Sequence, residues 1–231
     1  MTDLELPPSL TAVDPLELYA GALDGTALYR RFADGRLVPV PTRQWTGGLR
    51  PGDESLLARC PGSTLDVGCG PGRLTVALQQ RGRAALGIDI SPRALTLARA
   101  AGAQVLARDV FGDVPGVGGW TRLLLADGNV GIGGDVGRLL SRCAELLRPG
   151  GVVFLELPAA PTAALGISGD DTAIRLEDAA GRVSSWFRWS EPDAAGVRRA
   201  AAGTGLRQVA AWTAAGRSFL GLATRLGTTG S

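Results

Sequence analysis

The 231-residue sequence predicts an α/β fold in which helices cover both faces of a mostly parallel sheet. Between residues 63 and 157, short apolar runs alternate with segments whose apolar residues recur at helical spacing. The last run, residues 151–157, is apolar almost throughout, which is typical of a strand buried on both faces. Hydrophobic residues make up 45% of the chain and charged residues 20%, as in a folded globular domain.

The first 60 residues form short elements separated by proline and glycine, and we expect them to fold into a helical cap. Residues 16–23 and 27–32 are expected to be helices, because each is followed by an Asp-Gly pair that can supply the positive φ of a helix end. Residues 37–52 are expected to be extended. Asp53 is expected to cap a short helix that continues to residue 59.

The core strands are predicted from apolar runs, and the helices between them from their spacing and caps. Ser91 and Pro92 supply a capping hydroxyl and a first-turn proline for one helix. Asp135 caps the clearest helix, which Pro149 and Gly150 follow. Strands are expected at residues 64–67, 84–90, 104–107, 122–126 and 151–157.

After the core we expect a hairpin around residues 179–181, a helix from Pro192 to Gly203 and a final strand pair at 206–212 and 217–224. The expected domains are a cap or lid segment at 1–60, a core domain at 61–226 with a hairpin insertion at about 172–190, and a tail at 227–231.

Composition excludes several kinds of function. The formal net charge of +2 is too small to attract nucleic acid or an acidic membrane, so neither is expected as a partner. The chain has no histidine, which excludes imidazole metal sites and a histidine base, and no metal is expected. The three cysteines form no CxxC pair, and neither a secretory start nor an apolar run of about 18 residues is present, so we expect a cytoplasmic protein.

The strongest local signal is the run LDVGCGPG at residues 65–72, in which a strand passes through glycines into a helix. Glycines let a backbone approach a ligand closely, and the helix start offers unpaired N–H groups. The alternative is a tight turn with no ligand. Arg73 stands where a dinucleotide fingerprint needs its third glycine, and Asp66 would repel a pyrophosphate, so both residues disfavour NAD.

Two further carboxylates follow the next strands. Asp89 lies 19 residues after Gly70 and can accept hydrogen bonds from both hydroxyls of a ribose. A capping role for Asp89 is the alternative, but Ser91 already fills it. Asp109 can accept from an adenine amino group while Val110 covers the ring, or it can simply cap a loop.

Residues 63–157 resemble the class I S-adenosylmethionine-dependent methyltransferases. This resemblance implies a Rossmann-like, doubly wound, mostly parallel seven-stranded sheet with an antiparallel last strand, and S-adenosylmethionine across the carboxyl ends of the first strands. It also implies which residues contact the cofactor: Asp66, Gly68 and Gly70 at the methionine part, Asp89 at the ribose, and Asp109 with Val110 at the adenine. Cys69, Ile90 and Asp127 are further expected cofactor contacts. The matching motifs are LDVGCGPG at 65–72, GIDIS at 87–91, ARDV at 107–110, LLLADGNVG at 123–131 and LLRPGG at 146–151.

The acceptor is expected to be a small molecule. The tetrapeptide 127–130, Asp-Gly-Asn-Val, departs from the Asp/Asn-Pro-Pro-Tyr of amide and adenine N-methyltransferases, and no Pro-Cys nucleophile is present. Tyr19, Asn129 and Trp186 are the expected substrate contacts. Trp186 is predicted to lie on the opposite face of the hairpin from Phe187 and Trp189, where it could roof a substrate pocket or simply pack.

The predicted activity is therefore methyl transfer to a small molecule, driven mainly by positioning of donor and acceptor. If a base is needed, Asp127, Glu156 or a tyrosine could serve, since the chain contains neither histidine nor lysine. The alternatives are a non-catalytic protein that keeps the cofactor site and, less favoured, an NAD-dependent oxidoreductase. The oligomeric state is left open.

Overall fold

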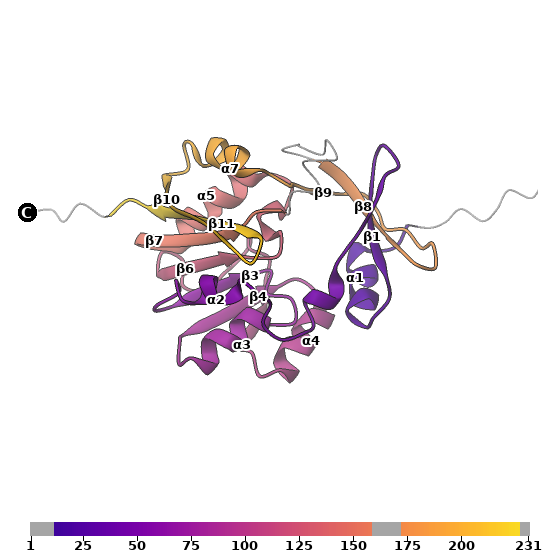
Figure 1. The fold of residues 1–231 in the computed structure, drawn as a ribbon, viewed down its shortest axis with the longest axis horizontal. Coiled ribbons are helices and arrows are strands. Elements are labelled where there is room, and N and C mark those ends of the chain that lie inside the picture. The colour runs from indigo at the N-terminus through magenta and orange to yellow at the C-terminus, as the bar shows by residue number, and fades with distance from the viewer. Residues whose placement is uncertain (1–11, 159–171, 227–231) are drawn as a thin grey trace, which may run out of the picture.

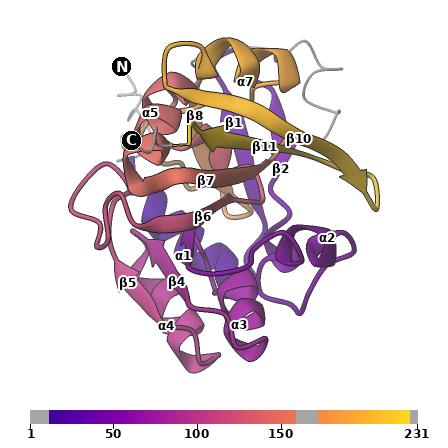
Figure 2. The ribbon, with the colours of Figure 1, turned by 90° about the vertical axis from the view of Figure 1, so that its left-hand side faces the viewer.

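A computed structural model describes residues 12–158 and 172–226 of the chain, and a seven-stranded sheet forms the centre of the molecule (Figure 1). The sheet is parallel except for β11, which runs antiparallel to both of its neighbours, so the predicted topology is confirmed. Figure 2 shows the strands stacked from β10 to β5. In spatial order they are β10 (Leu206–Ala214), β11 (Arg217–Thr224), β7 (Leu147–Glu156), β6 (Trp120–Leu125), β3 (Thr64–Val67), β4 (Ala85–Asp89) and β5 (Val105–Ala107).

Helices pack on both faces of this sheet and bury its apolar side chains. On one face, α2 (Asp53–Leu57) and α3 (Arg73–Gln80) pack against Phe154 and Phe219, while α4 (Pro92–Ala100) packs beside α3. On the other, α5 (Val136–Leu146) and α7 (Ala194–Ala201) cover the aliphatic side chains of β3, β6, β7 and β11. The carboxyl ends of the parallel strands are thereby fixed at one edge.

Local capping follows the sequence at two of the three predicted sites. Ser91 Oγ accepts from the N–H of Ala94, and Asp135 accepts from the N–H of Arg138. The prediction for Asp53 was wrong, because Gly52 occupies the N-cap and Asp53 is the first residue of α2, which ends at Leu57. The Asp53 carboxylate instead accepts from the backbone N–H of Arg50 at 2.7 Å.

The predicted helix at 27–32 was also wrong, because these residues form a strand of a second, four-stranded sheet. Within it, β1 (Leu28–Phe32) pairs on one side with β2 (Leu37–Pro39) and on the other with β8 (Thr172–Asp178). The Asp34-Gly35 pair closes the β1–β2 hairpin, in which Gly35 has a φ of +87°. The fourth strand is β9 (Phe187–Trp189), which pairs with β8 as the predicted hairpin.

The N-terminal segment and the hairpin thus build one cap rather than two separate additions. Helix α1 (Pro15–Leu23) packs against β8 through Leu18 and Leu176, and the 3₁₀ turn η1 (Thr42–Gln44) follows β2. Helix α2, although it lies within the first 60 residues, packs into the core through Leu56 and Leu57. The predicted tail at 227–231 lies outside the described residues.

The cap sheet stands beside the edge of the core sheet at which the parallel strands end (Figure 1). The loops that follow β3, β4, β5 and β6 therefore face the cap, and a cavity lies between the two sheets. Across residues 12–158 and 172–226, no helix has both the length and the apolar character needed to cross a membrane.

Candidate active site

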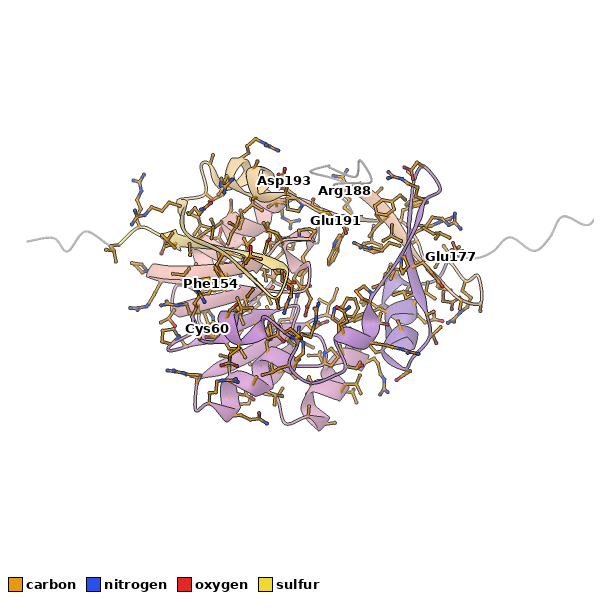
Figure 3. All side chains as sticks on the ribbon, viewed as in Figure 1. Cys60, Phe154, Glu177, Arg188, Glu191 and Asp193 are labelled. Atoms are coloured by element: carbon orange, nitrogen blue, oxygen red, sulfur yellow. The ribbon has the colours of Figure 1, made fainter. Side chains whose placement is uncertain are left out.

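The cavity has a volume of about 570 Å³, within the range of roughly 300–1,000 Å³ typical of small-molecule sites. The loops after β3 to β6 form one wall. Helix α1, Trp45 and the inner face of the cap sheet form the other. The cavity thus joins residues from widely separated parts of the chain, which Figure 3 shows as side chains converging between the two sheets.

The glycine turn after β3 requires glycine at two positions. Gly68 has a φ of +68° and Gly70 a φ of +54°, both in the left-handed region that glycine adopts most easily. A Cβ on Gly68 would lie 2.7 Å from Nδ2 of Asn129. That amide nitrogen donates to the carbonyls of Val67 and Gly68 at 2.9 and 2.8 Å. Asn129, which the sequence analysis expects to contact the substrate, lines the cavity. Its amide N–H groups are already used to hold the glycine turn.

Asp66 is buried beneath this turn, with only 3% of its surface exposed. Its carboxylate accepts a hydrogen bond of 2.7 Å from the hydroxyl of Thr75. Burial raises the pKa of Asp66 to about 7, and the Thr75 hydroxyl opposes part of this rise. A positively charged group beside Asp66 would stabilise the carboxylate form.

Asp89 lies at the end of β4 and closes over the same turn. One carboxylate oxygen accepts from the N–H of Gly70 at 2.9 Å, and the other accepts from the N–H of Ser91 at 2.8 Å. Burial raises the pKa of Asp89, while these backbone donors lower it in part. The sequence predicts Ser91 alone as the capping residue at this position. In the structure, the Asp89 carboxylate also bonds the backbone here, through the N–H of Ser91.

All nine predicted cofactor contacts line this one cavity. Asp109 accepts from the N–H of Phe111 at 2.9 Å, so the loop bond considered as its alternative role is present as well. Val110 is buried beside it, whereas Ile90 is 56% exposed. The nine are Asp66, Gly68, Cys69, Gly70, Asp89, Ile90, Asp109, Val110 and Asp127.

Asp127, which follows β6, is engaged in ion pairs. It has a φ of +54°, and its carboxylate pairs with the guanidinium groups of Arg50 and Arg73. Arg73 also pairs with Asp53, and its side chain is only 5% exposed. Arg217 lies 3.7 Å from the same carboxylate, so Asp127 is surrounded by arginines.

Glu156, at the end of β7, belongs to the same ion-pair network. It accepts from the backbone N–H of Asp127 at 2.8 Å and pairs with Arg217 at 2.7 Å. Burial alone would raise the pKa of Glu156, but the guanidinium of Arg217 and the N–H of Asp127 lower it below its ordinary value. Among the described residues, Glu156 does not line the cavity. Its contact with the site is the hydrogen bond from the backbone N–H of Asp127.

The predicted substrate contact Trp186 does not line the cavity among the described residues. It is 47% exposed, and the guanidinium of Arg175 lies 5.0 Å from its ring centroid. Trp189 lines the cavity instead, together with Phe187. The alternation of β9 turns residues 187 and 189 inward, and the same alternation in the sequence could have identified Trp189 as the wall residue.

Tyr19 does line the cavity, as predicted. Its ring meets Trp45 edge to face at a centroid distance of 5.8 Å. Burial, reinforced by the negative charge of Asp89, raises the pKa of the Tyr19 hydroxyl above its ordinary value. The hydroxyl therefore stays protonated at neutral pH and can donate a hydrogen bond.

Residues 64–151 match the family model described as a methyltransferase domain. They contain the glycine turn and all the acidic residues named above that line the cavity. This part of the chain is therefore similar to methyltransferase domains. Among the described residues, no group of three or more histidine, cysteine or acidic side chains could hold a metal ion.

Curated proteins that are similar to the chain in sequence are named as methyltransferases. The chain is 36% identical over 140 residues to trans-aconitate 2-methyltransferase of Paracidovorax citrulli, covering 57% of this chain and 49% of that protein. It is 34% identical over 134 residues to the enzyme of the same name from Deinococcus radiodurans, covering 57% and 48%. The chain thus spans about half the length of the curated relatives it matches.

A solved structure shares the whole fold. The S-adenosylmethionine-dependent methyltransferase from Bacteroides fragilis, in complex with S-adenosylhomocysteine, superposes with a TM-score of 0.73 at 21% identity. The match covers 96% of this chain and 98% of that one, so the similarity includes the cap as well as the core.

Proposed function

We propose that the protein transfers a methyl group from S-adenosylmethionine to a small molecule. The observation that carries this proposal is the placement of three carboxylates, Asp66, Asp89 and Asp109, around one cavity beside the glycine turn. A donor that combines an ammonium, a sulfonium, two ribose hydroxyls and an adenine amino group matches this series of acceptors.

The cavity residues fit such a donor in their chemistry. Asp66 would face the charged methionine part, because burial raises the pKa of this carboxyl and a cation beside it would stabilise the carboxylate. Asp89 keeps lone pairs on both oxygens for the ribose hydroxyls, although each oxygen already accepts one backbone bond. Asp109 and Val110 would hold the adenine. Glycine at 68 and 70 provides the left-handed backbone of the turn, and at 68 it also makes room for the Asn129 side chain.

S-adenosylmethionine, when bound, supplies a methyl carbon already activated by its sulfonium, so the protein has mainly to align the acceptor and exclude water. The cap does both. Tyr19 and Trp45 close one side of the cavity and Trp189 another. Because these walls come from the cap, acceptor shape is set by the cap and donor binding by the core.

No general base is needed in this proposal. Asp127 is neutralised by two arginines, Glu156 is bound by Arg217 away from the cavity, and the Tyr19 hydroxyl keeps its proton. The predicted catalytic roles of Asp127 and Glu156 are therefore replaced by positioning roles. The acceptor must then bring its own nucleophile, such as a carboxylate or a neutral amine.

Methyl transfer can be tested with S-adenosylmethionine and a panel of small carboxylic acids and amines, read by mass spectrometry as the gain of one methyl group. We expect one acceptor class to gain mass while S-adenosylhomocysteine accumulates. Asp89→Ala should lose this turnover, whereas Asp34→Asn, on the exposed β1–β2 turn, should keep it. Binding of the donor with no turnover on any acceptor would favour the non-catalytic alternative.

A further inference from the structure

The face of the cap sheet that lines the cavity carries an arginine, Arg30, among apolar side chains. Leu28 and Phe32 on β1 are buried, and Arg30 lies between them on the same face. Leu176, opposite Arg30 across the β1–β8 pairing, is also buried and lines the cavity with it. A charged side chain in such surroundings calls for a function, because burial of a cation is costly unless it is paired.

Arg30 is only partly satisfied by the protein. Its Nη1 pairs with Glu191, yet its buried Nε finds no hydrogen-bond partner within the described part of the chain. The second carboxylate oxygen of Glu191 is likewise buried and unpartnered there. Burial also lowers the pKa of Arg30. An unsatisfied donor at a cavity wall is a place where a ligand gains affinity.

Arg30 and Glu191 differ in their position relative to the cavity. Arg30 lines the cavity, whereas Glu191 is 8% exposed and lies behind the cavity wall. Glu191 therefore holds one edge of the guanidinium and leaves the Nε edge for another group. A guanidinium edge presents two parallel N–H groups, which match the two oxygens of a carboxylate.

We propose that Arg30 anchors a carboxylate of the methyl acceptor and thereby selects acceptors that carry one planar anion on an apolar body. The apolar part of the acceptor would contact Ile174, Phe187 and Trp189, which line the cavity around Arg30. Glu191 is a positioning residue in this arrangement. The proposal rests on the proposed function, since it names the acceptor class of the same site.

The test uses protein saturated with S-adenosylhomocysteine, which is titrated with trans-cinnamate and with its neutral isostere trans-cinnamamide. Wild-type protein is expected to bind cinnamate at least about 10-fold more tightly, as a charge-assisted hydrogen bond provides. Arg30→Gln should remove this preference. Arg31→Gln is the matched control, because Arg31 is the next residue on the strand, lies on the opposite face and pairs with Glu177 at 2.6 Å.

Three results would overturn the proposal: equal affinity of wild-type protein for the two probes, no binding of cinnamate at millimolar concentration, or a preference that survives in Arg30→Gln. Affinity for S-adenosylhomocysteine is measured first in every variant and is expected to stay unchanged. Failure of wild-type protein to bind S-adenosylhomocysteine counts against the proposed function. Absence of the carboxylate preference in wild-type protein that binds S-adenosylhomocysteine normally counts only against the role of Arg30.

Discussion

The buried carboxyl of Asp66 predicts an unusual dependence of stability on pH. In the folded protein its pKa is raised to about 7 from the ordinary value of 3.8, which applies to the unfolded chain. The folded state therefore holds a proton that the unfolded state has already released. The stabilisation of the folded state by this bound proton is fully present below pH 3.8 and is lost as the pH rises through about 7.

The magnitude follows from the separation of the two pKa values. At about 1.4 kcal/mol for each pH unit, the separation corresponds to about 4 kcal/mol in total. Between pH 5 and pH 8 the wild-type protein should lose about 2–3 kcal/mol of unfolding free energy through this group. Asp66→Asn cannot ionise and can still accept from the Thr75 hydroxyl, so it should not show this loss.

The assay is urea denaturation of the ligand-free protein and of Asp66→Asn at several pH values, because the difference between the two curves isolates Asp66. Thr75→Val provides a second variant. Removal of the hydroxyl that donates to the carboxylate should raise the pKa of Asp66 further and move the loss to higher pH. A difference between wild type and Asp66→Asn that stays constant from pH 5 to pH 8 would refute the reasoning.

Three other substitutions follow from the site. Asp89→Ala removes both carboxylate oxygens expected at the ribose and should weaken S-adenosylhomocysteine binding about 10- to 100-fold in calorimetry. The circular dichroism spectrum should stay unchanged, and unchanged affinity would show that Asp89 is not part of the site. Asp127→Asn removes one of the two carboxylates that pair with the buried guanidinium of Arg73, the other being that of Asp53. It should lower the free energy of unfolding by about 1–3 kcal/mol in urea, less than loss of a fully buried pair because Asp127 keeps 18% exposure, while the exposed control Asp34→Asn should change it little. Trp189→Ala should lower kcat/KM for any acceptor found in the screen, whereas Trp186→Ala should not; equal effects would contradict the assignment of the cavity wall.

Much of the core could be predicted because its determinants are local. The strand at residues 64–67 and the caps Ser91 and Asp135 follow directly from apolar runs and from side chains that bond the next turn. It could also be predicted that Asp66, Asp89 and Asp109 come together, because they lie at or just beyond the carboxyl ends of parallel strands, which meet at one edge of a sheet.

The cap and the ion-pair network could not be predicted in the same way, because their partners are distant in the chain. Residues 27–32 become a strand through pairing with β8, more than 140 residues later, and no short pattern in that segment records this partner. Arg50, Arg73 and Arg217 converge on the acidic side chains only after folding. Nothing in the sequence indicates which acidic side chains these arginines pair with.

Titration calorimetry of the wild-type protein with S-adenosylhomocysteine and, separately, with NAD tests most directly whether the acidic cavity is a site for an adenosyl methyl donor. The structure leads us to expect saturable 1:1 binding of S-adenosylhomocysteine and none of NAD, whose pyrophosphate Asp66 would repel. Binding of NAD alone, or of neither compound, would contradict the assignment.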